Sequence, residues 1–288
     1  MFIILLLFIY GLMHPLLISS STRNSLLLFS TYILPSLFFY IFILDILFKM
    51  KSLNKATNGL FNIFKIFKIR SNYSVLIILF SFFVGNPTNA KNVIDLLDEN
   101  KINKNEANYL LCTTHFVSIG FSITFVGIIL KNYLLCIVPI TANIISNLIL
   151  MILNKNEGQR KKEEIVNVKY DFSSSFTKTI NVLIMICAVT LFSGILIDIL
   201  LELKFPKIFL GFIEITRGIK ELNNLDIRLF ISFISAFLSF GGVSIHLQIY
   251  NIIRNKLNYK KFLFNRILAS IFSFIICYEI YFLINLKI

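Results

Sequence analysis

The sequence predicts an all-α polytopic membrane protein of about eight spans or hairpin segments, in two repeat-like halves with broken helices at the midplane. Two observations support this. First, 57% of the 288 residues are hydrophobic, 15% are charged and the mean hydropathy is +0.80. Apolar stretches near the roughly 20-residue length of a bilayer-spanning helix recur throughout. Second, two polar, glycine-bearing segments, 85–91 and 241–248, interrupt such stretches.

Residues 1–153 form the first predicted half. Residues 1–20 lack a basic start and a clear cleavage site, so we expect a retained first span. A second span is expected at 25–48. Residues 50–72 are basic and amphipathic, with Phe at every third position from 61 to 67, which suits a helix lying on the cytoplasmic membrane surface.

The first broken segment occupies residues 74–97. In the polar turn that follows, at 98–106, Asn103 is expected to cap the next helix, with Glu106 three residues on. Spans at 109–130 and 133–153 complete the half.

A polar segment at 154–179 separates the halves and is expected to be a solvated loop. In the second half, residues 180–288, we expect spans near 180–201, 205–220, 227–250 and 262–286. Each break is followed by a similar tail, Asn100-Lys101-Ile102-Asn103 or Asn255-Lys256-Leu257-Asn258. Their offset of 155 residues (255 minus 100) predicts an internal repeat, whose orientation the sequence leaves open.

The net charge of +13 comes from basic residues between apolar stretches, as is typical of cytoplasmic loops. They are Lys49, Lys51, Lys55, Lys65, Lys68, Arg70, Lys155, Arg160, Lys161 and Lys162. There is no zinc-finger spacing or arginine-rich tail, so we expect the lipid bilayer, and not nucleic acid, as a partner. The four cysteines lie in or beside apolar stretches without a Cys-x-x-Cys pair, which predicts neither a metal site nor a disulfide. No cofactor is expected, and the sequence leaves a homo-oligomer open.

The first break is a candidate anion site. A broken helix presents free N–H groups at the start of its second half, where a negative charge is favoured. Lys91 adds a cation that could bind the anion directly, or could simply mark a cytoplasmic helix end. The candidate residues are Gly85, Asn86, Pro87, Thr88, Asn89 and Lys91.

The second break carries three polar side chains at alternate positions, Ser244, His246 and Gln248, after Gly241 and Gly242. In a helix Ser244 and Gln248 share a face and His246 points elsewhere, whereas an extended segment aligns all three. His246 could titrate near neutral pH, although a lone His in a polar pocket is more often a hydrogen-bond donor.

Charged groups within apolar stretches indicate function, because burying them in a bilayer is costly. Glu214 is the strongest case, with Thr216 and Gly218 nearby, and could hold a proton, a sodium ion or a substrate donor. The alternative is a structural ion pair with Arg217 or Lys220. Three other acidic residues, Asp45, Asp198 and Glu202, lie beside basic residues and indicate the membrane edge.

An enzymatic function is not expected. The sequence contains no G-x-S-x-G, P-loop or H-E-x-x-H motif, and no carboxylate pair accompanies a nucleophile.

In order, four segments resemble the sporulation integral membrane proteins of the YlbJ, or SpoVV, type, which carry the nucleoside-recognition or Gate domain. They are Leu34-Pro35-Ser36-Leu37-Phe38, 85–91 with Asp95-Leu96 and Glu106-Ala107, 211–218, and 241–248. The resemblance covers nearly the whole chain. It implies a transporter in a bacterial cell membrane, related to concentrative nucleoside carriers. It also implies movement of dipicolinic acid from the mother cell across the outer forespore membrane.

Under this interpretation, Lys91, His246 and backbone N–H groups would bind the small anionic solute. Glu214, Thr216 and Gln248 would hold a coupling proton or sodium ion, or shape the site. One departure concerns 112–117, where the family has an Asn-rich segment with Pro and this chain has Cys112-Thr113-Thr114-His115-Phe116-Val117. Two alternatives stay open, a non-transporting scaffold of spore formation and a carrier of a nucleoside-like solute.

Overall fold

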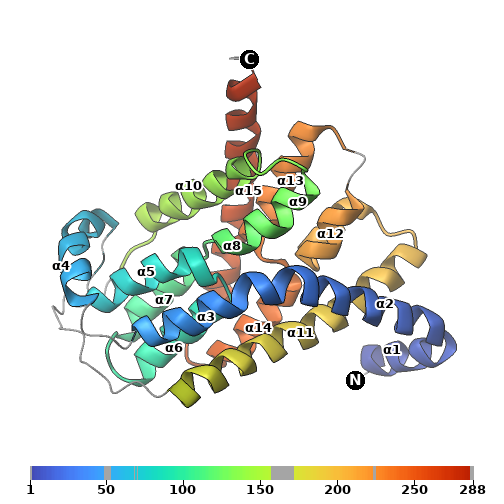
Figure 1. Cartoon of the computed structure of the whole chain (residues 1–288), viewed down its shortest axis with the longest axis horizontal. Helices are drawn as coiled ribbons and strands as arrows, with labels where there is room; N and C mark the ends of the chain where they lie inside the picture. The colour runs from blue at the N-terminus through green and yellow to red at the C-terminus, as the bar shows by residue number, and fades with distance from the viewer. Residues whose placement is uncertain are drawn as a thin grey trace.

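The computed structural model describes residues 2–48, 53–67, 69, 71–156, 172–222 and 225–285, and every regular element in these ranges is helical (Figure 1). Four helices are long and apolar enough to cross a membrane, or up to five if a bent pair counts as one span. They are Pro15–Phe48, Phe172–Glu202, Ile227–Ile253 and Tyr259–Leu283, and the bent pair is Thr57–Phe67 with Asn72–Val84. Two shorter apolar helices, Ile119–Ile129 and Ile137–Leu153, add to these, so the expected eight spans or hairpin segments are confirmed only in part.

The N-terminal boundary differs from the prediction. Helix α1 (Phe2–Met13) has only 12 residues, and the chain breaks at His14. Helix α2 (Pro15–Leu28) then continues through the π-helical turn η1 (Phe29–Ile33) into α3 (Leu34–Phe48). The expected span at 1–20 is therefore wrong, whereas the one expected at 25–48 lies within the candidate span Pro15–Phe48, which starts ten residues earlier. The break falls at His14 because Pro15 lacks an N–H and suits the first helical position. The polar residues at 19–24 stay helical.

Helix α4 (Leu53–Phe64) and the 3-10 turn η2 (Lys65–Phe67) form the expected amphipathic segment, and Phe61 is buried in the core. Helix α5 (Asn72–Val84) starts at Ser71, whose side chain accepts a hydrogen bond from the N–H of Ser74. Of the basic residues assigned to loops, Lys49, Lys51, Lys68, Arg70 and 160–162 lie outside the described residues.

The first broken segment is followed by a second break that the sequence does not predict. Helix α6 (Thr88–Asp98) leads to α7 (Lys104–Thr113), and Asn103 caps α7 as predicted, at 2.9 Å from the N–H of Glu106. The chain is then irregular at 114–118 before α8 (Ile119–Phe121), the π turn η3 (Ser122–Val126) and α9 (Gly127–Ile129). The predicted span at 109–130 is thus broken near its start. Helix α10 (Ile137–Leu153) ends the half.

In the second half, α11 (Phe172–Glu202) is a single helix of 31 residues, so the polar segment expected at 154–179 ends within it. The 3-10 turn η4 (Lys207–Phe212) and α12 (Ile215–Glu221) replace the expected span at 205–220, which is wrong because Glu214 starts a new helix there. Helices α13 (Ile227–Phe240), α14 (Gly242–Ile253) and α15 (Tyr259–Asn285) complete the chain.

The element boundaries repeat at the offset that the two tails indicate. Adding 155 residues to the bounds of α5 and α6 gives 227–239 and 243–253, which are the positions of α13 and α14 within one residue. The same offset places α2–α3 on α11 and the start of α7 on that of α15. The caps also correspond, because Asn258 accepts a hydrogen bond from the N–H of Lys261 as Asn103 does from Glu106.

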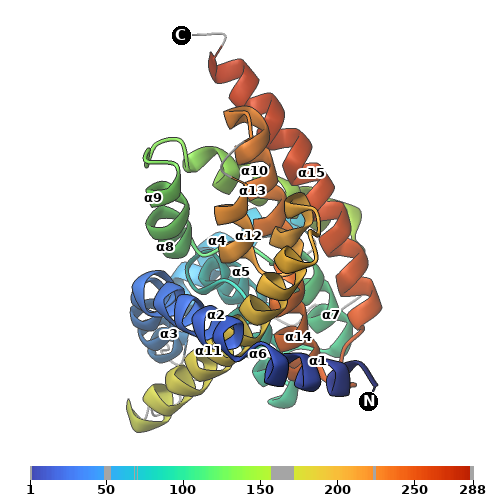
Figure 2. The same cartoon turned by 90° about the vertical axis from the view of Figure 1, so that its right-hand side faces the viewer.

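The corresponding helices α2–α3 and α11 pack antiparallel. Gly194 lies against Ser25, and Lys178 forms an ion pair with Asp45. Figures 1 and 2 show α15 packed along α13 and α10, with the α2–α3 and α11 pair crossing beside them. Apolar side chains such as Leu16, Leu27, Ile184 and Ile275 are exposed on these helices, as lipid-facing surfaces require. The chain is thus a candidate integral membrane protein with several helical spans.

Candidate functional site

Four irregular points of the chain meet around one buried cavity of about 90 Å³. They are 85–87 between α5 and α6, 114–118 after α7, 213–214 before α12, and the junction of α13 and α14 at Gly241. Direct contacts join them. The Ser118 hydroxyl donates to the carbonyl of Phe83 at 2.6 Å, and the N–H of Ser244 donates to the carbonyl of Ile213 at 3.0 Å. Residues distant in sequence thus form a single site.

Asn86 and His115 connect the first break to the irregular segment 114–118. The Asn86 side-chain oxygen accepts from the N–H of Ala90 at 3.2 Å, so its amide nitrogen is the donor to Nδ1 of His115 at 2.7 Å. A neutral His115 then carries its proton on Nε2. The side chain of His115 also lies against Gly241 of the second break, so one imidazole touches both broken segments.

Glu214 is the charged side chain on the cavity wall, and it is only 4% exposed. Its carboxylate caps α12, accepting from the N–H groups of Thr216 and Arg217 at 3.1 and 2.8 Å and from the Thr216 hydroxyl at 2.6 Å. The structural alternative of an ion pair with Arg217 is not what the structure shows, because the Arg217 guanidinium contacts Asp198. Glu214 is therefore held by neutral donors and faces the cavity.

The second break places two polar side chains on the cavity wall. Gly241 is left-handed, with φ of +95°, and α14 begins directly after it. Ser244 and Gln248 then share one helix face and line the cavity, whereas His246 points away, as the helical alternative predicted. The side-chain oxygen of Gln248 is buried and has no hydrogen-bond partner. Such an acceptor is costly unless a ligand or water donates to it.

His246 fills a structural position between α13 and α15. Its Nε2 lies 3.1 Å from the carbonyl of Phe240, and its Nδ1 lies 3.1 Å from the Tyr259 hydroxyl. Both ring nitrogens are therefore occupied by protein groups.

Half of the predicted site residues line the cavity. They are Gly85, Asn86, Pro87, Glu214, Thr216, Ser244 and Gln248. The others lie outside the cavity wall. They are Thr88, Asn89, Lys91, Gly218, Gly241, Gly242 and His246. The side chain of Lys91 is 42% exposed and pairs with Asp95 at 2.8 Å, and Gly218 lets α12 pack closely on Gly211.

The structure also alters the predicted use of backbone N–H groups. At three of the four irregular points some of these groups have protein acceptors, since Asn86 accepts from Ala90, Glu214 from Thr216 and Arg217, and Ile213 from Ser244. These particular N–H groups are thus bound to the protein itself.

Sequence reasoning missed residues that line the cavity. His115 and Ser118 lie in the irregular segment after α7, and Thr190 lies on α11. The departure of 112–117 from the family pattern was the only signal for His115. The apolar remainder includes Ile33, Leu37 and Phe121. Together these walls fit a small solute that is largely apolar and donates hydrogen bonds.

Arg266 is a further residue that sequence reasoning missed, and it is fully buried. Its guanidinium donates to the carbonyls of Cys112 and Ser239 at 2.5 and 3.3 Å and to the side-chain oxygen of Asn147 at 3.1 Å. No carboxylate pairs with it among the described residues. Asn147 in turn donates to the carbonyl of His115, so this positive charge lies behind the cavity wall. A single Arg within the apolar stretch 262–286 was the available signal.

Comparisons of the chain with protein-family models, with curated proteins and with solved structures found no match. In the described part of the chain, no group of three or more His, Cys, Asp and Glu side chains is placed to hold a metal ion. The functional argument therefore starts from the cavity itself.

Proposed function

We propose that this protein is a membrane carrier for a small solute, which binds in the cavity where the broken segments meet. The observation that supports this most directly is the convergence of four chain breaks on one buried cavity whose wall carries Glu214 and an unpartnered Gln248 oxygen. Irregular backbone at membrane depth is tolerated where it lines such a cavity, and carriers build binding sites there.

The position of the cavity along α11 supports a site at the middle of the bilayer. Lys178 and Asp198 both form ion pairs with other helices and lie 20 residues apart (198 minus 178). A straight helix of that length is about 30 Å long, which matches the hydrocarbon core of a bilayer. Ile186 and Thr190 line the cavity, each eight residues from the nearer ion pair. The cavity is thus at mid-depth when α11 crosses the membrane.

The family resemblance makes dipicolinate the first solute to test, with a role in the outer forespore membrane. The cavity offers acceptors, Glu214 and Gln248, and not free cations. A carboxylate solute is therefore expected to enter with a proton or sodium ion at Glu214, which removes the repulsion between two negative charges. The same acceptors favour a nucleoside-like solute as the second candidate, because such a molecule donates hydrogen bonds itself.

The test is uptake of labelled dipicolinate into proteoliposomes of the purified chain, with and without proton and sodium gradients. We expect saturable uptake that falls at least about tenfold in Glu214→Gln, which equals about 1.4 kcal/mol of lost interaction. Glu221→Gln is the matched control, because it removes a carboxylate of the same helix that pairs with Lys207 outside the cavity.

Two results would count against the proposal. Uptake that is unchanged in Glu214→Gln removes this residue from the site. No uptake of dipicolinate or of a nucleoside panel, from folded protein under any gradient, would favour the non-transporting scaffold. The altered segment 112–117 contributes His115 to the cavity wall, which supports a binding site there.

A further inference from the structure

A second, open basin of about 750 Å³ lies outside the central cavity. Its wall carries four cationic side chains, Lys91, Lys178, Arg254 and Lys256, and one carboxylate, Asp98. None of these residues lines the central cavity. The basin is formed by α6, α11 and α14 and by the turn after α14.

The same face of α6 lines both spaces. Pro87, directly before the helix, lines the central cavity, and Lys91, Ile94 and Asp98 line the basin. These positions are separated by four, three and four residues, which places them in one row along an α-helix. This row of α6 therefore lines the central cavity at one end and the basin at the other.

Helices α11 and α14 repeat this arrangement. On α11, Thr190 and Ile186 line the cavity, and Val182 and Lys178 line the basin, each four residues from the next. On α14, Ser244 and Gln248 line the cavity, and Asn251 and Ile252 line the basin one turn later. Helix α14 contacts both α6 and α11. The two spaces therefore lie end to end along one three-helix seam.

We propose that this basin is the entry vestibule of the carrier and binds small carboxylate or phosphate anions before they reach the central cavity. This inference rests on the proposed carrier function and adds a first binding site to it. It also assigns a role to Lys91, because the sequence predicts that this residue contacts an anion and the structure places it on the vestibule wall.

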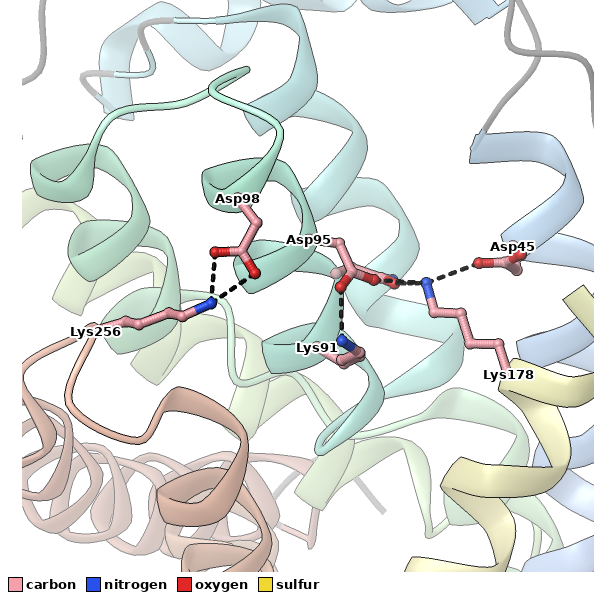
Figure 3. Close-up of polar contacts among 7 residues, drawn as sticks. Asp45, Lys91, Asp95, Asp98, Lys178 and Lys256 are labelled. Carbon is pink, nitrogen blue, oxygen red and sulfur yellow. Dashed lines mark hydrogen bonds and ion pairs between the residues drawn. The ribbon is translucent and has the colours of Figure 1, made fainter. Parts of the chain in front are cut away.

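Ion pairs connect the elements around the vestibule (Figure 3). Lys178 bridges Asp45 of α3 and Asp95 of α6, at 2.8 and 2.9 Å, and thereby joins three helices at the seam. Lys256 joins Asp98 at 2.6 Å, connecting the turn after α14 to the end of α6.

Counting the four cations against Asp45, Asp95 and Asp98 leaves one positive charge (four minus three). Arg254 has no ion-pair partner within the described residues. A recess with a net positive charge attracts anions.

The vestibule faces the cytoplasm according to the charge distribution of the sequence. Helix α3 ends at Phe48, beside the Asp45–Lys178 pair, and the sequence continues with Lys49 and Lys51. Basic residues next to a span indicate its cytoplasmic end. Anions are therefore collected from the cytoplasmic side.

The test measures the electrostatic potential of the vestibule without relying on transport. Asn251→Cys places a thiol on the vestibule wall of the full chain in neutral liposomes, and its reaction rates with a negatively charged and a positively charged methanethiosulfonate reagent are compared. We expect the negatively charged reagent to react faster with this thiol than the positively charged reagent does. Adding Arg254→Gln and Lys256→Gln should lower the ratio of the two rates at least about threefold. Lys204→Gln together with Lys207→Gln, both outside the vestibule, is the charge-matched control, and the chain without the new cysteine gives the background.

Ligand protection identifies what the vestibule binds. Dipicolinate or inorganic phosphate should slow the reaction of the cysteine at 251, and the effect should weaken with salt because exposed charges are screened. If the two neutralising substitutions leave the ratio of the rates unchanged, the proposed anion-binding vestibule is wrong. Protection that requires anionic phospholipid in the liposomes, and that dipicolinate does not reproduce, assigns the basin to a lipid headgroup instead. If the vestibule behaves as expected but wild-type protein transports nothing, the carrier proposal fails and the anion site stands.

Discussion

At the scale of single residues, the site depends on polar side chains that form hydrogen bonds between the broken helix ends. His115 is the clearest example. Its carbonyl accepts from Asn147, its Nδ1 accepts from Asn86, and its ring lies against Gly241. One residue thereby fixes the relative positions of two breaks that lie 155 residues apart in the repeat. A substitution at 115 should affect both breaks together.

Arg266 has the corresponding role behind the cavity, and we predict that Arg266→Met destabilises the protein. The carbonyls of Cys112 and Ser239, near the ends of α7 and α13, would lose a buried donor. Each buried acceptor left without a partner costs about 1–3 kcal/mol, so the unfolding free energy should fall by at least about 2 kcal/mol. Thermal unfolding in detergent measures the change.

Lys260→Met is the matched control, since it removes one positive charge from the exposed start of the same helix. Its effect should stay within about 0.5 kcal/mol. Equal stability of Arg266→Met and the wild type would show that the desolvation cost of this charge cancels its hydrogen bonds. The assigned role of Arg266 would then be wrong.

At the scale of elements, the helix breaks occur at glycines whose positions cannot accommodate a side chain. Gly85 and Gly241 both have positive φ, and a Cβ at Gly241 would lie 2.8 Å from Nε2 of His115. Glycine is thus required at the second break by backbone conformation and by the contact with His115. The corresponding α7 and α15 differ, because the chain is irregular at 114–118 while α15 continues unbroken.

We predict that Gly241→Ala lowers the unfolding free energy by about 1–2 kcal/mol, because a residue with a Cβ is strained in a left-handed conformation. The same change should lower solute uptake, because the added Cβ displaces His115. Gly59→Ala on α4 is the matched control. No atom lies within 4 Å of its added Cβ, and the change favours the helix. Thermal unfolding and uptake are measured on both. Wild-type stability in Gly241→Ala would mean that the junction relaxes without strain.

At the scale of the whole molecule, polar contacts between distant segments hold the helices together at the vestibule end of the seam. The two turns that carry the repeated tails meet there, through the Lys256–Asp98 pair and a 2.8 Å hydrogen bond from the N–H of Asn258 to the Asn108 side chain. The opposite end of α11 is joined to α12 by Asp198 and Arg217. The molecule thus has two polar ends with an apolar middle.

This arrangement predicts the topology of the chain in a membrane. Cysteines introduced at Lys104 and Asn255, near the two turns, should react with a membrane-impermeant reagent from the same side. A cysteine at Lys207, beyond the far end of α11, should react from the opposite side. Labelling of sealed vesicles before and after permeabilisation measures this, with the unsubstituted chain as background. Reaction of all three from one side would contradict a membrane-crossing α11.

The sequence alone determined the helical class, the apolar composition, the two glycine breaks and the 155-residue offset, because glycine, proline and apolar periodicity act over a few residues. Glu214 was also identifiable, since burying a carboxylate in an apolar stretch is costly and therefore indicates a function. The end of α7, the partners of His115 and the position of Lys91 outside the central cavity were decided by tertiary contacts. Long-range hydrogen bonds and ion pairs, such as Asn86 with His115, depend on which segments meet, and local sequence does not encode that.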